Sequence, residues 1–159
     1  MRKEKHMKKL KLLLIPIFCL IPAVLFAQTS DQMQLIREAA KANKKLIVST
    51  NLQLTEGEAK GFWSIYEEYQ KALRELNERT GKVIKDYANN YNYLSDEKAK
   101  SILEDYITIE EDRIKLQKSY ISRFNKVLPA KKVTRYYQIE NKLSAIMKYD
   151  LARGIPLVK

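Results

Sequence analysis

The chain has few of the residues on which most enzyme and metal sites depend. Its 159 residues include one cysteine and one histidine, Cys19 and His6. Both lie within residues 1–27, a segment that we expect to be removed. The remaining chain, 28–159, then has no thiol and no imidazole. Disulfide bonds, Cys/His zinc sites, Cys–His pairs, Ser–His–Asp triads and His-containing di-iron centres are thereby excluded.

Glycine and proline are also scarce, with four of each in the whole chain. Only Pro129 and Pro156 lie beyond the first 27 residues, so turns are few and no linker is evident. Apolar residues recur at helical spacing throughout the rest. We therefore predict an all-α fold, a four-helix bundle built on a hairpin of long helices, with 28–159 as a single domain.

Residues 1–27 are typical of a cleaved secretory signal. A lysine-rich start precedes an apolar run from Leu12 to Phe26, which Pro16 and Pro22 interrupt. The run is shorter than the ~20 residues that a membrane-spanning helix needs. Two alternatives stay open, a retained anchor and a true start at Met7. After cleavage we expect no integral membrane segment.

The apolar spacing and the capping residues predict four helices, at about 31–49, 56–90, 96–127 and from Pro129 to just before Gly154. The start of the predicted second helix rests on a capping box, in which the side chains of Thr55 and Glu58 each accept a hydrogen bond from the other residue's backbone N–H. Leu54 precedes the cap and is expected to pack on the first turn. We assign Thr55 and Glu58 a structural role rather than a catalytic one.

Charge is divided unequally along the chain. Residues 51–112 hold 8 basic and 14 acidic side chains, and residues 113–159 hold 12 basic ones against Glu140 and Asp150. Export argues against nucleic acid as the partner of this basic half. The alternatives are acidic protein segments, anionic lipid and the acidic half of a second copy.

The predicted fourth helix carries the strongest candidate for a binding surface. Lys131, Arg135 and Lys142 share one stripe, which is either a solvated polar face or a protein-binding stripe. Tyr136 is equally consistent with a contact surface and with the core. Trp63, at the edge of the apolar face of the second helix, is a further candidate contact residue.

Glu140 is expected on the apolar side of the fourth helix, where an unpaired carboxylate would be costly. Counting outward from the turn at Leu128-Pro129 places Gln117 opposite Glu140, with Arg113 one turn further on. We therefore predict that Arg113 or Gln117 binds Glu140. The densest carboxylate cluster, 110–112, consists of consecutive helical residues that cannot converge on one substrate, so we do not expect an enzyme.

Two short runs resemble the motifs of the Spy/CpxP-like periplasmic helical proteins. Residues 51–58 (NLQLTEGE) resemble the family's Leu-Thr-x-x-Gln motif, and residues 125–132 (NKVLPAKK, with Leu128 and Pro129) resemble its second copy. Glu58 and Lys132 stand where the family has glutamine. The resemblance covers about residues 30–150.

This resemblance implies a thin, curved all-α subunit that forms a cradle-like homodimer in the periplasm. Some members of the family are ATP-independent stress chaperones, which bind unfolded or partly folded envelope proteins on a basic, partly apolar surface. Others are signalling adaptors that dock on the periplasmic domain of an envelope stress sensor. The zinc-binding branch uses histidines, which 28–159 lacks, so no metal or cofactor is expected. The sequence is equally consistent with a chaperone and with a signalling adaptor.

Overall fold

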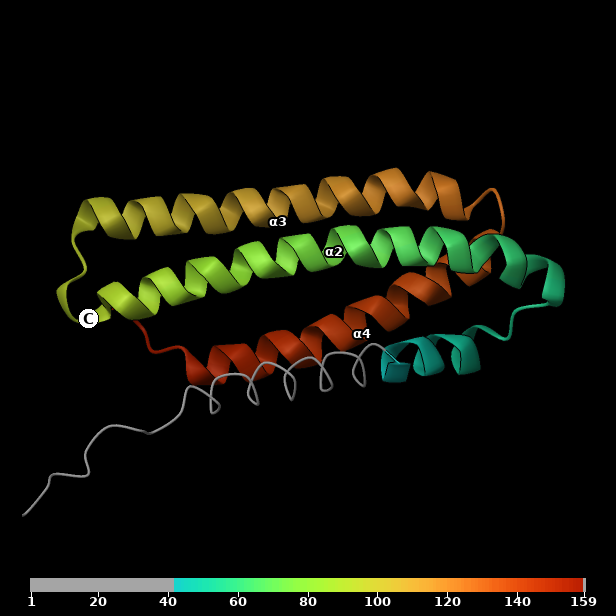
Figure 1. Ribbon diagram of the computed structural model, residues 1–159, viewed down its shortest axis with the longest axis horizontal. Coiled ribbons are helices and arrows are strands. Elements are labelled where there is room, and N and C mark those ends of the chain that lie inside the picture. The colour runs from blue at the N-terminus through green and yellow to red at the C-terminus, as the bar shows by residue number, and fades with distance from the viewer. Residues whose placement is uncertain (1–41, 159) are drawn as a thin grey trace, which may run out of the picture. The chain divides into compact units, whose positions relative to one another are not determined.

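The computed structural model describes residues 42–158 and shows an all-α architecture (Figure 1). A helical segment over 42–52 is followed by α2 (Glu56–Asn90), a short 3-10 turn η1 (Tyr91–Tyr93), α3 (Asp96–Phe124) and α4 (Ala130–Gly154). Within this part of the chain there is no strand. The predicted signal and most of the predicted first helix lie outside the described residues.

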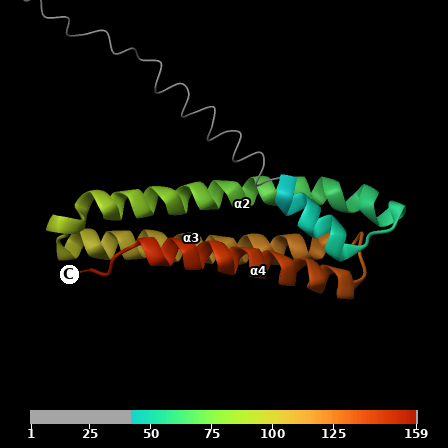
Figure 2. The same ribbon diagram turned by 90° about the horizontal axis from the view of Figure 1, so that it is seen from below.

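The long helices α2 and α3 form the predicted hairpin. They run side by side and antiparallel, and both views show them together along most of their length (Figures 1 and 2). The chain then turns back into α4, which is inclined to the α2–α3 pair in Figure 1. No helix of the described residues combines the length and apolar character that crossing a bilayer requires.

The capping box at the start of α2 is present as predicted. The Thr55 hydroxyl accepts a hydrogen bond from the Glu58 backbone N–H at 3.3 Å, and the Glu58 carboxylate accepts one from the Thr55 N–H at 2.8 Å. Leu54 is half-buried against the core. With its first orphan N–H groups satisfied, α2 continues for 35 residues and has the predicted bounds, 56–90.

The turn between α3 and α4 comes earlier than predicted. Helix α3 ends at Phe124, not at residue 127, because the next residues form a tight turn in which the Leu128 N–H donates to the Phe124 carbonyl at 2.9 Å. Leu128 is buried beneath this turn. Pro129 caps α4 instead of lying within its first turn, and α4 includes Gly154.

The core is concentrated where 42–52, the first half of α2, the end of α3 and the start of α4 meet. Its largest members are aromatic rings that contact one another edge-on or tilted, with neighbouring centroids 4.9 to 6.2 Å apart. We call these five residues the aromatic cluster: Phe62, Tyr66, Tyr69, Phe124 and Tyr136. Val48 and Leu52 cover it from the 42–52 segment. Offset and edge-on aromatic pairs of this kind add to the stabilisation from burial.

Toward the end of the α2–α3 hairpin that contains the η1 turn, fewer side chains are buried. Leu76 and Ile109 are the buried apolar residues found there within the described part of the chain. Met147 and Leu151 continue the apolar spacing of α4, which places them on its apolar face, but both are about half exposed. That placement was wrong because α4 extends beyond the aromatic cluster, so its inward-facing positions no longer meet a packed partner.

Candidate protein-binding surface

The exposed face of α4 contains the three predicted basic residues. Lys131, Arg135 and Lys142 are all exposed. On an ideal helix these positions and three more lie within an arc of about 60°. We call this row the α4 surface: Lys131, Arg135, Lys142, Ile146, Tyr149 and Arg153.

The second half of the α4 surface is partly apolar. Ile146 is 61% exposed and Tyr149 is 64% exposed. The Arg153 guanidinium carbon lies 5.8 Å from the centroid of the Tyr149 ring, within cation–π range. Sequence reasoning missed this extension because an isoleucine in an amphipathic helix is expected on the buried face. The sequence does contain an indication of it: Ile146 follows Lys142 by four residues and Tyr149 follows Ile146 by three, so all three lie on the same face of the helix.

The α4 surface faces away from α3. Two side chains fix the α3-facing side of α4: the Tyr137 hydroxyl donates to the Gln117 carbonyl at 3.1 Å, and the Lys148 ammonium lies 2.7 Å from the Glu110 carboxylate. The α4 surface lies roughly 140° around the helix from these contacts. Arg135 also donates to the Asn51 carbonyl at 3.4 Å, which links the surface to the end of the 42–52 helix.

Tyr136 belongs to the core and not to the contact surface. Its side chain is fully buried, with ring centroids of Phe62 and Phe124 at 5.3 and 4.9 Å. Its hydroxyl accepts a hydrogen bond from the Gln70 amide at 3.1 Å. Burial raises the pKa of Tyr136 far above its ordinary value. Its inclusion among the candidate binding residues was therefore wrong, and Tyr149 is the exposed aromatic ring of this face.

Trp63 lies at the edge of the aromatic cluster. Its half-buried indole packs edge-on against Phe62 and Tyr66, with centroids 5.0 and 5.2 Å away. The Lys45 ammonium sits 4.9 Å above the ring. Among residues 42–158 no hydrogen bond, ring contact or cation–π contact joins Trp63 to the α4 surface.

Glu140 is buried on the apolar side of α4, as predicted, but its partners are different residues. The Lys44 ammonium lies 2.8 Å from one carboxylate oxygen, and the Gln70 amide donates to the other at 3.0 Å. Glu140 is 5% exposed, whereas Lys44 is 26% exposed. This network joins the 42–52 helix, α2 and α4, and no buried side-chain polar atom of the described residues lacks a partner.

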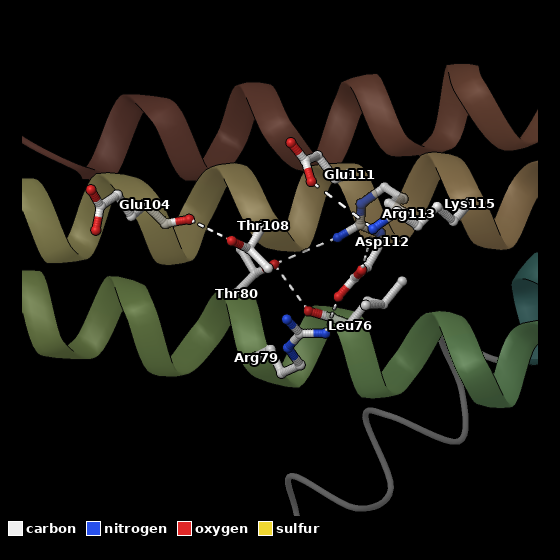
Figure 3. A network of polar contacts seen from close by, with 9 residues as sticks. All are labelled: Leu76, Arg79, Thr80, Glu104, Thr108, Glu111, Asp112, Arg113 and Lys115. Carbon is white, nitrogen blue, oxygen red and sulfur yellow. Dashed lines mark hydrogen bonds and ion pairs between the residues drawn. The ribbon is translucent and has the colours of Figure 1, made fainter.

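Arg113 and Gln117 do not bind Glu140. Arg113 reaches from α3 toward α2, where it donates to Asn77 at 3.0 Å and to Thr80 at 3.5 Å; Figure 3 shows the contact with Thr80. Gln117 contributes its backbone carbonyl, which accepts from Tyr137. The prediction was wrong because it assumed that α4 turns this face toward α3, whereas Glu140 faces α2 and the 42–52 helix.

The acidic run 110–112 diverges, as its helical spacing predicts. The Lys148 ammonium of α4 lies 2.7 Å from Glu110. The Arg79 guanidinium of α2 lies 2.8 Å from Asp112, a contact that Figure 3 shows. The hydrogen bond from Arg79 holds the pKa of Asp112 below its usual value. In the described part of the chain, no three Asp, Glu, His or Cys side chains converge to hold a metal ion.

Comparison with known proteins gives this chain no relative. No family model matches it, no curated protein matches it, and no solved structure matches it.

Proposed function

We propose that this protein is a non-enzymatic, exported protein-binding module that uses the α4 surface to hold unfolded or partly folded envelope proteins. The observation that supports it is the row of exposed basic and apolar side chains along one face of α4, from Lys131 to Arg153. The Spy/CpxP-like resemblance of residues 51–58 and 125–132 agrees with this function.

The chemistry of the surface suits partners without a fixed structure. Cationic side chains attract the acidic segments of a partner over roughly a Debye length, about 10 Å at 0.1 M salt. Ile146 and Tyr149 then offer apolar contact to side chains that an unfolded protein exposes. Such a surface favours weak binding of many sequences over tight binding of one.

The test is suppression of aggregation by unrelated proteins diluted from denaturant. The chain should reduce light scattering at near-stoichiometric ratio, and less so at 1 M salt, where the Debye length falls to about 3 Å. The variant Lys131→Glu/Arg135→Glu/Lys142→Glu should lose this activity and keep its helical circular dichroism.

A matched control changes the net charge equally at another place. Lys71, Lys82 and Lys85 are exposed on α2 and form no ion pair within the described residues, so their reversal to glutamate should leave the activity intact. An equal loss of aggregation suppression in both variants would show that the activity depends on net charge alone, and would contradict a binding role for α4. Tight binding of one sensor domain without aggregation suppression would favour the adaptor function instead.

Export is tested separately. When the full chain is expressed with a secretion system, we expect the protein to reach the periplasm and its mass to correspond to a start at Gln28. Retention of residues 1–27 in the purified protein would favour the anchored alternative.

A further inference from the structure

The end of the molecule that contains η1 also holds the last described residues of the chain. Residues 155–158, which follow α4, are not helical, and the Tyr87 hydroxyl of α2 donates to the Pro156 carbonyl at 2.9 Å. Both views place the C-terminal end of the chain beside the turn between α2 and α3 (Figures 1 and 2). Two segments far apart in the sequence therefore lie at one end, and we call residues 91–94 and 155–158 the hairpin tip.

The hairpin tip exposes large apolar side chains. Tyr93 is 95% exposed, Leu157 89% and Val158 62%. Tyr93 belongs to η1, and the two aliphatic residues directly follow Pro156, so the hydrogen bond from Tyr87 holds them at this end. In water these side chains lack the stabilisation that burial would bring, and a group of exposed apolar residues at one place typically marks a contact surface.

The charges around the hairpin tip are nearly balanced, unlike those of the α4 surface. Residues 82–104 hold four basic and four acidic side chains, and residues 148–158 hold two basic and one acidic. The Lys98 ammonium lies 2.7 Å from the Asp86 carboxylate, so part of this charge is already paired. A partner with strong charge of one sign therefore gains little here. The tip suits an uncharged partner, or one whose positive and negative groups balance.

The surroundings of these side chains favour a lipid interface over a pocket of another protein. The tip side chains come from two short segments and form no continuous helix face. The grooves beside α3 lie elsewhere, one near Leu76 and Leu116 and the other near Ile121 and Val133. The boundary between lipid headgroups and acyl chains accepts separate side chains at different depths. It also suits a tyrosine ring, whose body is apolar and whose hydroxyl stays hydrated.

We propose that the hairpin tip is a membrane contact, with which this protein attaches to the surface of a zwitterionic lipid bilayer. Tyr93, Leu157 and Val158 enter the boundary between headgroups and acyl chains, whereas α2 and α3 remain in water. A single myristoyl chain gives an association constant of only ~10⁴ M⁻¹. Three side chains that enter only the boundary should bind no more tightly, so we expect reversible attachment at millimolar lipid.

The membrane contact does not depend on the proposed function. Its three side chains lie outside the α4 surface, and measuring it requires only lipid. The two contacts also differ in their response to salt. Salt screens the attraction of the basic α4 surface, but it does not weaken the burial of apolar side chains. Binding through the hairpin tip should therefore change less than about twofold between 0.1 and 1 M salt.

A tryptophan at the tip tests whether this end of the molecule enters the lipid. The chain has one tryptophan, Trp63, which lies near the opposite end of α2. In the Trp63→Phe/Tyr93→Trp variant, tryptophan emission should shift to shorter wavelength when phosphatidylcholine vesicles are added, and brominated phosphatidylcholine should quench it. Wild type, with Trp63 far from the tip, should show neither change. Unchanged emission of the folded variant at millimolar lipid, or an equal change in wild type, would overturn the proposal.

Co-sedimentation with the same vesicles tests the aliphatic side chains. The protein is isolated after export, and its mass shows whether residues 1–27, whose apolar run would bind lipid by itself, have been removed. Where they are retained, the tryptophan measurement decides. Leu157→Asp/Val158→Asp should lower binding at least about tenfold, because two apolar side chains no longer enter the lipid. Leu46→Asp, at a 64% exposed leucine of the 42–52 helix, is the matched control and should bind as wild type does.

The remaining comparisons separate the tip from the basic surface. Lys131→Glu/Arg135→Glu/Lys142→Glu should bind phosphatidylcholine vesicles as wild type does. Binding that requires phosphatidylglycerol and disappears at 1 M salt would assign lipid binding to the α4 surface and contradict the proposal. Undiminished binding of the folded Leu157→Asp/Val158→Asp variant would exclude the tip. If wild type bound no vesicles but this variant lost aggregation suppression, the tip would be part of the client-binding surface instead.

Discussion

The Lys132 ammonium lies 2.6 Å from the Glu58 carboxylate, and the same carboxylate oxygen accepts the hydrogen bond from the Thr55 N–H. Lys132 also donates at 3.0 Å to the carbonyl of Gln53, which is the one non-glycine residue of the described chain with positive φ. This ion pair therefore fastens the start of α4 to the loop before α2. Glu58 and Lys132 are also the two positions where the sequence departs from the glutamines of the resembled motif, and here they contact each other.

This relationship predicts a pH dependence of stability. The hydrogen bonds from Lys132 and from the Thr55 backbone lower the pKa of Glu58 from its ordinary 4.5. A group whose pKa is lower in the folded state stabilises that state above the unfolded pKa, and the contribution is lost as pH falls through the folded value. The stability difference between wild type and Glu58→Gln in urea unfolding should therefore narrow below about pH 4.5. A constant difference throughout the acid range would contradict this linkage.

Loss of the helix cap should reduce stability without affecting binding. Thr55→Ala removes the hydroxyl that accepts from the Glu58 N–H, and such substitutions cost ~1 kcal/mol. Urea unfolding measures the cost, and aggregation suppression measures the function. Abolished binding at unchanged stability would show that Thr55 has a functional role instead.

The buried Lys44–Glu140 pair should respond asymmetrically to substitution. Lys44→Met leaves a nearly inaccessible carboxylate with Gln70 alone, and we expect a loss of about 2–4 kcal/mol. Glu140→Gln leaves a Lys44 ammonium that already reaches solvent, so the loss should be smaller, about 1–2 kcal/mol. Chemical unfolding of both variants tests the order. Equal losses would mean that the carboxylate is better solvated than its burial indicates.

Two glycines of α2 should behave oppositely when replaced by alanine. A Cβ at Gly61 would lie 2.8 Å from a methyl group of Val127 and force the α3–α4 turn outward, so Gly61→Ala should destabilise. A Cβ at Gly81 meets nothing within 4 Å, and Gly81→Ala should stabilise by up to about 1 kcal/mol through helix propensity. Thermal melting compares the two. If Gly61→Ala were more stable than wild type, the α3–α4 turn would have to shift at little cost to accommodate the added methyl group.

Tyr136 and Tyr149 provide a test that separates core from surface. Tyr136→Phe removes the hydroxyl that accepts from Gln70 and should cost about 1 kcal/mol while leaving client binding unchanged. Tyr149→Ser should weaken aggregation suppression and change stability little, since the ring is exposed. If Tyr136→Phe weakened client binding and Tyr149→Ser did not, Tyr136 rather than Tyr149 would be the contact residue.

The helices were predictable because their signals are local. Thr55, Glu58 and Ser95 form caps through neighbours three residues away. Apolar or tolerated residues recur at three- and four-residue steps from Ala59 to Tyr91, so the bounds of α2 follow from the sequence alone. The end of α3 was placed three residues late because Val127 continues the apolar spacing. In the structure Val127 instead lies in the turn and packs against Gly61, a contact between residues far apart in the sequence that helical spacing does not reveal.

The partners of Glu140 were not predictable by the same reasoning. Helical spacing shows which side of α4 is apolar, and Glu140 is indeed buried there. It does not show which helix covers that side, and Lys44 comes from a helix 96 residues earlier in the chain. Tyr136 was ambiguous for a related reason: the paths of the 42–52 helix, of α2 and of the end of α3 determine whether that ring is enclosed.

Because the core is concentrated near one end of the hairpin, the free energy of local unfolding should decrease from that end toward the other. Backbone amides near the aromatic cluster are held by packed rings, so their hydrogen exchange should require near-global unfolding. Near the η1 turn no residue from 81 to 108 is buried, and the contacts there include the exposed Lys98–Asp86 ion pair and the Tyr87–Pro156 hydrogen bond. The last turns of α4 should therefore exchange earlier. Tyr149 and Arg153 lie on those turns, so this part of the α4 surface opens without disturbing the aromatic cluster, which suits the proposed binding of partners that lack a fixed structure.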